Sequence, residues 1–221
     1  MTTLPPELRA AILEQAKRTP SPDAGKTGRA RALAVTVGVA IAIACFAPFG
    51  LKLGGRPPAF VALSAVGWAA IAIAASVVAA AKRKTMLGVA RSVLALVALG
   101  AAPAFFAWFM GCTMGWPDVR DGAGTFHQHV ICLLSTSLFA LGPVVALAFL
   151  RRGSDPVHPR ATGAALGAAA GAWGGVLIDL HCPLASPMHV AIGHVLPIAI
   201  YAVLGALVGS RLFGVRPSSE K

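Results

Sequence analysis

Six long apolar segments, separated by short polar stretches, dominate the chain. They cover residues 32–51, 58–81, 86–110, 127–150, 161–180 and 189–213. Each has about the 20 residues that an α-helix needs to cross the hydrocarbon core of a bilayer. The pattern predicts an all-α integral membrane protein built as a six-transmembrane-helix bundle, with Arg91 interrupting the third segment.

The amino-acid composition favours the same class of protein. Hydrophobic residues make up 57% of the chain, charged residues only 12%, and the mean hydropathy is +0.75. An ordinary soluble domain carries about 25% charged residues. The first 31 residues are polar and charged, and the apolar run that follows has no small-residue cleavage pattern. We therefore expect no cleaved signal peptide.

The net charge of +11 is explained by membrane topology. In a soluble protein such a charge would suggest nucleic-acid binding, but Lys and Arg also collect at the cytoplasmic loops of membrane proteins. With the N-terminus inside, sixteen of the nineteen Lys and Arg residues fall on the cytoplasmic side, and only Lys52, Arg56 and Arg120 fall outside. We expect both termini in the cytoplasm and no direct contact with nucleic acid. The predicted parts are a cytoplasmic tail 1–31, a transmembrane domain 32–213 and a C-terminal tail 214–221.

Glycines recur every four residues in the last two apolar segments. The fifth segment contains Gly163, Gly167, Gly171 and Gly175, and the sixth contains Gly205 and Gly209. Small residues on one helix face let a second backbone approach closely, which favours helix association in lipid. We expect this packing to occur within the monomer. Pro197 is expected to kink the sixth helix, because proline removes one backbone hydrogen bond and crowds the carbonyl of Gly193.

The N-terminal tail contains one predicted amphipathic helix, over residues 4–18, followed by a linker at 19–26 that is rich in Pro, Ser and Gly. Its apolar residues repeat at helical spacing. They are Leu4, Leu8, Ile12, Leu13 and Ala16. Such a helix either lies on the membrane surface or docks into a groove of a soluble partner. Glu7 and Glu14 make a strongly cationic membrane anchor less fitting.

Eight of the ten Cys and His residues fall at the predicted outer face. They are Cys112, His127, His129, Cys132, His181, Cys182, His189 and His194. Thiolates and imidazoles suit zinc or copper, and a site needs about four of them. The spacing does not select which four. Because the outer side is oxidising, a disulfide between Cys132 and Cys182 is the alternative.

Helical geometry sorts these residues only in part. His129 and Cys132 are three residues apart and share a helix face. His189 and His194 are expected to lie about 140° apart around a regular α-helix. Asp179, near the end of the fifth segment, is a candidate to orient a ligating imidazole. Cys45 stands alone in the first segment and is expected to be a core residue.

The order of these features resembles the NrsF-type polytopic anti-sigma factors, and a light-responsive anti-sigma factor of myxobacteria has a similar layout. The resemblance rests on a short Leu-containing tail, six spans, Cys132 near the start of the fourth span, residues 180–183 (Leu-His-Cys-Pro) and residues 188–194. It implies a protein of the bacterial inner membrane whose tail binds an extracytoplasmic-function sigma factor. The paired cysteines of the family would correspond to Cys132 and Cys182, which would respond to metal or oxidant. The tail lacks the HxxxCxxC motif of soluble zinc-type anti-sigma factors.

Other classes of membrane protein remain as alternatives. A thiol oxidoreductase lacks its CxxC pair here, and Ser135 and Ser137 have no nucleophile-elbow motif around them. A quinone or haem protein would need His129 and His194 at matching depth. A metal transporter would need polar residues through the middle of the spans, which are mostly Ala, Val, Leu and Gly. We therefore expect a regulator rather than an enzyme.

Overall fold

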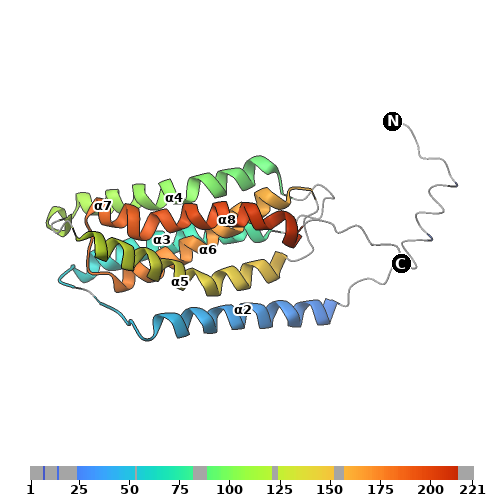
Figure 1. The fold of residues 1–221 in the computed structure, drawn as a ribbon, viewed down its shortest axis with the longest axis horizontal. Coiled ribbons are helices and arrows are strands. Elements are labelled where there is room, and N and C mark those ends of the chain that lie inside the picture. Colours follow the sequence, from blue (N-terminus) through green and yellow to red (C-terminus); the bar gives the residue numbers. More distant parts are fainter. Residues whose placement is uncertain are drawn as a thin grey trace.

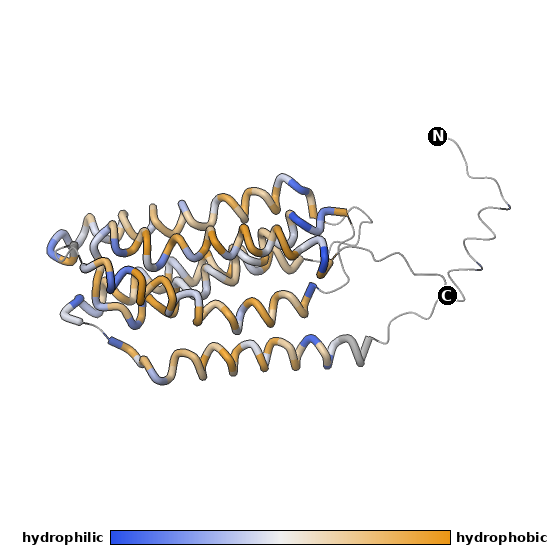
Figure 2. Tube along the Cα trace, in the orientation of Figure 1, coloured by the Kyte–Doolittle hydropathy of each residue, from blue (hydrophilic) through white to orange (hydrophobic). Residues whose placement is uncertain are grey.

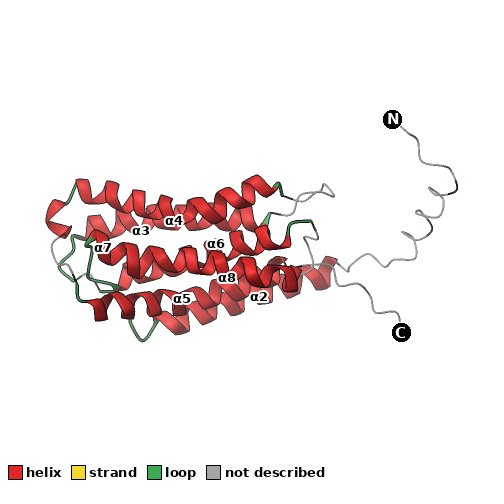
Figure 3. Ribbon diagram, turned by 45° about the horizontal axis from the view of Figure 1, so that its top comes forward, coloured by secondary structure: helices red, strands yellow, loops and turns green. Residues whose placement is uncertain are grey.

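The computed structural model describes residues 7, 14, 24–52, 54–81, 89–120, 124–151 and 157–213. Within these ranges the regular structure is entirely helical, and six helices are long and apolar enough to span a membrane (Figure 3). This confirms the all-α prediction of six spans. The helices are α2 (Ala24–Phe46), α3 (Pro58–Ala80), α4 (Arg91–Met114), α5 (Phe126–Arg151), α6 (Pro159–His181) and a composite sixth span of α7 (Pro187–Val190), η2 (Ala191–Val195) and α8 (Leu196–Phe213), with a short 3₁₀ turn η1 (Pro117–Arg120).

Several predicted boundaries differ from the observed ones, most of all at the start of the first span, where α2 begins at Ala24 rather than at residue 32. The third span begins at Arg91 rather than at residue 86, so this arginine opens the helix and does not interrupt it. The first span ends at Phe46, before Pro48, and the chain turns at Gly50 with a φ of 66°. A positive φ is readily adopted by glycine. The predicted tail helix and its apolar residues Leu4, Leu8, Ile12, Leu13 and Ala16 lie outside the described residues.

The six spans form an antiparallel bundle (Figure 1). We call the end where α2, α4 and α6 begin the basic end. The opposite end, where α2, α4 and α6 end, is the cysteine end. Figure 2 shows apolar residues along the lengths of the helices and hydrophilic residues mainly at the two ends. This distribution is the one expected for helices surrounded by lipid.

Helix α6 lies at the centre of the bundle. In its most apolar stretch of 18 residues, 78% of the residues are buried, compared with 11% in α2. Helix α2 lies at the periphery and packs mainly against α5. Glycine allows a close α2–α5 contact, since a Cβ on Gly142 would collide with the carbonyl oxygen of Gly38. The central position of α6 follows from its sequence, since its Gly and Ala residues leave room for neighbours on every side.

The glycine series of α6 packs against α8. A Cβ on Gly163 would collide with the backbone of Gly205, and one on Gly167 would collide with the carbonyl of Tyr201. Gly171 meets the backbone at Ile198 in the same way, at 2.8 Å. Gly175 differs, because its nearest neighbour is the ring of Phe105 at 3.0 Å. Backbone contact between α6 and α8 therefore extends from Gly163 to Gly171, about two helical turns.

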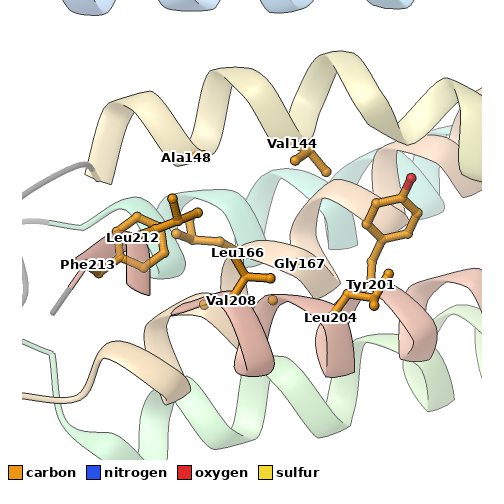
Figure 4. A pocket seen from close by; sticks show the side chains of 11 residues that line it. Val144, Ala148, Leu166, Gly167, Tyr201, Leu204, Val208, Leu212 and Phe213 are labelled. Atoms are coloured by element: carbon orange, nitrogen blue, oxygen red, sulfur yellow. The ribbon is translucent and has the colours of Figure 1, made fainter. Parts of the chain in front are cut away.

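An apolar cavity of about 250 Å³ lies where α5 and α8 diverge above the glycine face of α6. In Figure 4, Tyr201 points from α8 toward α5 at one end of this cavity. Its hydroxyl donates a hydrogen bond to the Ser137 carbonyl at 2.7 Å. The remaining lining is aliphatic or aromatic, including Val144, Leu166 and Phe213. The cavity offers no group suited to catalysis or metal binding.

Replacing Gly167 with Ala should destabilise the protein. The new Cβ would overlap the backbone of Tyr201, which moves only if the whole of α8 shifts. We expect the free energy of unfolding, measured in detergent micelles, to fall by about 1–3 kcal/mol. The matched control is Gly111→Ala in α4, where nothing lies within 4 Å of the new Cβ. Equal stability of the two variants would contradict this account of α6–α8 packing.

Candidate metal and redox centre

Four side chains from three parts of the sequence meet at the cysteine end. Cys132 comes from the start of α5, Cys182 directly follows α6, His189 belongs to α7 and His194 to η2. One ligand atom from each residue lies within 4.8 Å of those of the other three. Cys182, His189 and His194 are buried, and Cys132 is half-buried. We call this set the Cys2His2 cluster.

Cys182 is held in place by the way α6 ends. Its backbone is extended, with φ −79° and ψ 122°, and its N–H donates to the Ile178 carbonyl at 2.7 Å. Pro183 follows and cannot continue the helix. The Cys182 sulfur then lies 3.4 Å from the Cys132 sulfur and 3.1 Å from Nε2 of His189. The end of α6 thus directs its thiol at groups from α5 and α7.

A π-helical turn brings the two histidines together. The expectation that His189 and His194 lie about 140° apart assumed a regular α-helix, and this part of the sixth span is not one. Residues 191–195 form the π turn η2, in which hydrogen bonds join residues five apart. His189 and His194 are also five residues apart, and their ring centroids are 5.3 Å apart. Single π turns of this kind occur often at functional sites.

The Gly193 carbonyl, which Pro197 leaves without a backbone donor, has a side-chain donor instead. Pro197 has no N–H to offer to the carbonyl of Gly193, and this oxygen lies 2.7 Å from the Thr136 hydroxyl of α5. The same hydroxyl also lies 2.7 Å from the Cys132 carbonyl. A Cβ on Gly193 would come within 2.9 Å of the Cys132 Cβ. The missing donor and the missing side chain together let α5 approach η2 closely.

The two histidines of the cluster differ in their hydrogen bonding. Nδ1 of His189 lies 2.8 Å from Nδ1 of His129, so His129 contacts the cluster through His189. This leaves Nε2 of His189 facing the Cys182 sulfur. His194 is fully buried, and neither of its ring nitrogens has a hydrogen-bond partner among the described residues. A buried polar atom without a partner is costly, and a bound cation would remove that cost at one nitrogen.

The other sequence candidates lie elsewhere. His127 is exposed. Cys112 is buried in a separate core with Phe60 and Phe109. His181 turns toward α2: its Nδ1 lies 3.0 Å from the Gly50 carbonyl, and its ring meets Phe49 edge-on at 5.2 Å. The structure therefore does not bring His181 into the Cys2His2 cluster.

A buried ion pair beside the cluster was missed from the sequence. Arg56 donates through Nη1 to Oδ1 of Asp179 at 3.2 Å and through Nη2 to the Asp179 carbonyl at 2.7 Å. Both side chains are almost fully buried. Oδ2 of Asp179 has no hydrogen-bond partner in the described part of the chain, so this carboxylate holds Arg56 rather than an imidazole. The available signal was an arginine in the loop after the first span and an aspartate near the end of the fifth span, at the same end of the predicted bundle.

The environment of Cys182 favours its thiolate. The pKa of the Cys182 thiol lies below its ordinary value, first because the Cys132 thiol is placed to hydrogen bond to its sulfur. A hydrogen bond from His189 acts in the same direction, and burial opposes both. The thiolate is the form that binds metals and attacks oxidants. The cluster is thus suited to a thiophilic metal ion or to disulfide formation.

Comparison with protein families gave one match. A family model described as NrsF, negative regulator of sigma F, matches residues 15–214. Neither the curated proteins nor the solved structures contained a match to the chain. The matched range contains all six spans and every residue of the Cys2His2 cluster.

Replacing Asp179 with Asn should destabilise the protein strongly. The substitution removes the carboxylate charge that pairs with the buried guanidinium of Arg56. Breaking one partner of a buried ion pair costs about 3–5 kcal/mol, measurable by unfolding in mixed micelles. The control is Asp118→Asn on the exposed turn η1, which should change stability by less than about 0.5 kcal/mol. If both variants were equally stable, the ion pair would not be stabilising.

Proposed function

This chain belongs to the NrsF family of negative regulators of a sigma factor, and we propose that it holds an extracytoplasmic-function sigma factor at the bacterial inner membrane until an outer signal releases it. Family membership implies an anti-sigma factor with a sigma factor as its partner. Six apolar helices make it a multi-pass membrane protein. The proposal adds the class of sigma factor, the binding segment, the orientation and the signal.

Charge supports an orientation with the cysteine end outside. Arg29, Arg91, Arg151, Arg160 and Arg211 all belong to helix ends at the basic end. At the cysteine end, Arg56 is neutralised by Asp179. Basic residues are retained on the cytoplasmic side of membrane proteins. In this orientation the Cys2His2 cluster meets the oxidising compartment, and the N-terminal tail meets the cytoplasm, where a sigma factor is found.

The proposed partner-binding segment is the N-terminal tail. Its apolar stripe of Leu4, Leu8, Ile12, Leu13 and Ala16 is of the kind that docks into a groove on a soluble partner. The family match begins at residue 15, so most of this stripe precedes the matched range. The segment proposed to bind the sigma factor therefore lies mostly outside the matched range.

The proposed signal receptor is the Cys2His2 cluster. Two thiols and two imidazoles are a ligand set of zinc and of other thiophilic metals. Ligand atoms around tetrahedral zinc are about 3.3–3.8 Å apart. The four ligand atoms of the cluster lie within 4.8 Å of one another, so small side-chain movements would bring them to these distances. With Nε2 of His189 on the metal, its Nδ1–H would donate to His129 and so orient the ligating imidazole, as outer hydrogen-bond partners do in metal sites.

An oxidant would act on the same two thiols. With the sulfurs 3.4 Å apart, a peroxide can take two electrons and two protons from Cys132 and Cys182. The S–S bond then forms between α5 and the end of α6, and hydrogen peroxide leaves as two water molecules. Metal binding and disulfide formation have the same mechanical result, because both draw residue 182 toward residue 132.

A route from the cluster toward the tail runs through α2. The Lys52 N–H donates to the Leu180 carbonyl at 3.1 Å, and the His181 ring contacts the Gly50 carbonyl. Movement at Cys182 would therefore displace the segment that follows α2. Helix α2 is the least buried span and packs mainly on α5, so it can shift with little loss of packing. Its other end continues directly into the tail.

Two alternative functions receive less support. A bis-histidine haem would need two histidines on opposite faces of its ring, yet the His189 ring centroid lies 5.0 Å from that of His129 and 5.3 Å from that of His194. A metal transporter would need polar groups along the bundle. In the described residues, the middle of the central helix α6 is Gly and Ala, and Asp179 lies at its cysteine end.

The signal receptor can be tested with purified full-length protein and Zn²⁺ or Cd²⁺. We expect one ion per chain, with affinity reduced more than about a hundredfold by Cys132→Ser or Cys182→Ser, since each removes a ligand, and about ten- to a hundredfold by His129→Ala. Cys45→Ser is the control, because this thiol lies outside the cluster. Unchanged binding in both cluster variants would exclude the cluster as a metal receptor.

Sigma-factor binding is tested separately, by copurification with the full-length chain. We expect Leu8→Ala/Ile12→Ala to lower the amount of bound sigma factor at least about tenfold, because buried apolar anchors dominate such interfaces. Glu7→Ala/Glu14→Ala, on the same tail, should retain it. Equal retention by both double variants would show that the apolar stripe is not the binding surface. Absence of any sigma factor with the wild-type chain would contradict the proposed function itself.

A further inference from the structure

A cavity of about 510 Å³ opens at the basic end, between α4, α6 and α8. Arg91, the first residue of α4, and Arg160, in the first turn of α6, lie at its mouth. His158 and Ser210 complete the polar part of the lining. The cavity lies at the opposite end of the bundle from the Cys2His2 cluster and takes no part in the proposed sensing of metal or oxidant.

The rest of the cavity lining is apolar. Ala95, Ala98 and Leu99 line it from α4, Ala164 from α6 and Ala206 from α8. Arg91 and Leu99 are eight residues apart, so the lining runs about 12 Å along the helix axis. Alanine side chains leave space that larger residues would fill. A cationic mouth thus continues into a slot with the polarity of hydrocarbon.

The two arginines have no counter-charge in the described structure. Both are exposed, no carboxylate lines the cavity, and neither pairs with an acidic residue among the described residues. Guanidinium groups bind phosphate oxygens through two parallel hydrogen bonds, which makes arginine the preferred residue for phosphate recognition. Two such groups at one mouth are suited to a phosphate diester or monoester.

The position in the bilayer identifies the occupant. The basic end is the end that charge assigns to the cytoplasmic leaflet, where anionic lipids concentrate, and basic pockets between helices there bind lipid headgroups. We propose that this cavity binds one anionic phospholipid, with its phosphate on Arg91 and Arg160 and an acyl chain in the alanine-lined slot. The lipid fills the gap between α4 and α8, which contact each other far less than either contacts α6.

The test uses full-length protein in detergent, incubated with phosphatidylglycerol and examined by native mass spectrometry. The wild-type chain should retain one phosphatidylglycerol. Arg91→Gln/Arg160→Gln should bind it on the order of thirtyfold more weakly, because each arginine contributes about 1 kcal/mol of attraction to an anionic headgroup. The matched control, Arg29→Gln/Arg211→Gln, removes the same charge at the same end but outside the cavity. It should retain the lipid nearly as well as wild type.

A second variant probes the slot without changing any charge. Ala98→Phe should abolish retention while leaving the melting temperature within a few degrees of wild type. Phosphatidylcholine and inorganic phosphate serve as competitors, and neither should displace phosphatidylglycerol. If the two arginine double variants lost phosphatidylglycerol equally, general attraction to the basic surface would explain the binding, and the proposal would be overturned. Displacement by inorganic phosphate, or full retention in Ala98→Phe, would overturn it as well.

Discussion

Close backbone contact between α6 and α8 is the constraint on which the rest of the structure depends. Lipid gives apolar helices no hydrophobic reason to associate, so association requires surfaces that fit at backbone distance. Gly163, Gly167 and Gly171 supply that surface on α6. Because α6 is then enclosed on all sides, its end is fixed relative to the sixth span. Only residues 182–186 separate α6 from α7, so Cys182 is held facing His189 and His194.

The cysteine end adds polar interactions to this apolar framework. The π turn η2 carries His194 beside His189. The Thr136 hydroxyl donates a hydrogen bond to the Gly193 carbonyl, for which Pro197 has no N–H. The Arg56–Asp179 pair joins the loop after α2 to the last turn of α6. The same few residues thus shape the Cys2His2 cluster and connect it to the least buried span, α2. A sensor needs both features, a site that changes and an element that can follow it.

Sequence reasoning predicted the spans well and the site in part. All six apolar segments are helices, with ends that differ by a few residues because capping turns such as Gly50 are not visible in hydropathy. Placing the Cys and His residues at one end followed from counting spans. The separation of His181 and Cys112 from the Cys2His2 cluster could not be foreseen, since it depends on side-chain direction at helix ends. The π turn was missed because helical arithmetic assumes a constant 100° step.

The sequence by itself determined that the protein is a six-span helical membrane protein and that its thiols and imidazoles gather at one end. Both conclusions rest on local quantities, namely apolar run length and charge distribution, which the bilayer converts directly into topology. Only the tertiary structure decided that Cys132, Cys182, His189 and His194 converge and that Arg56 is buried against Asp179. These outcomes depend on how three helices approach one another, and that is set by glycine contacts and a π turn acting together.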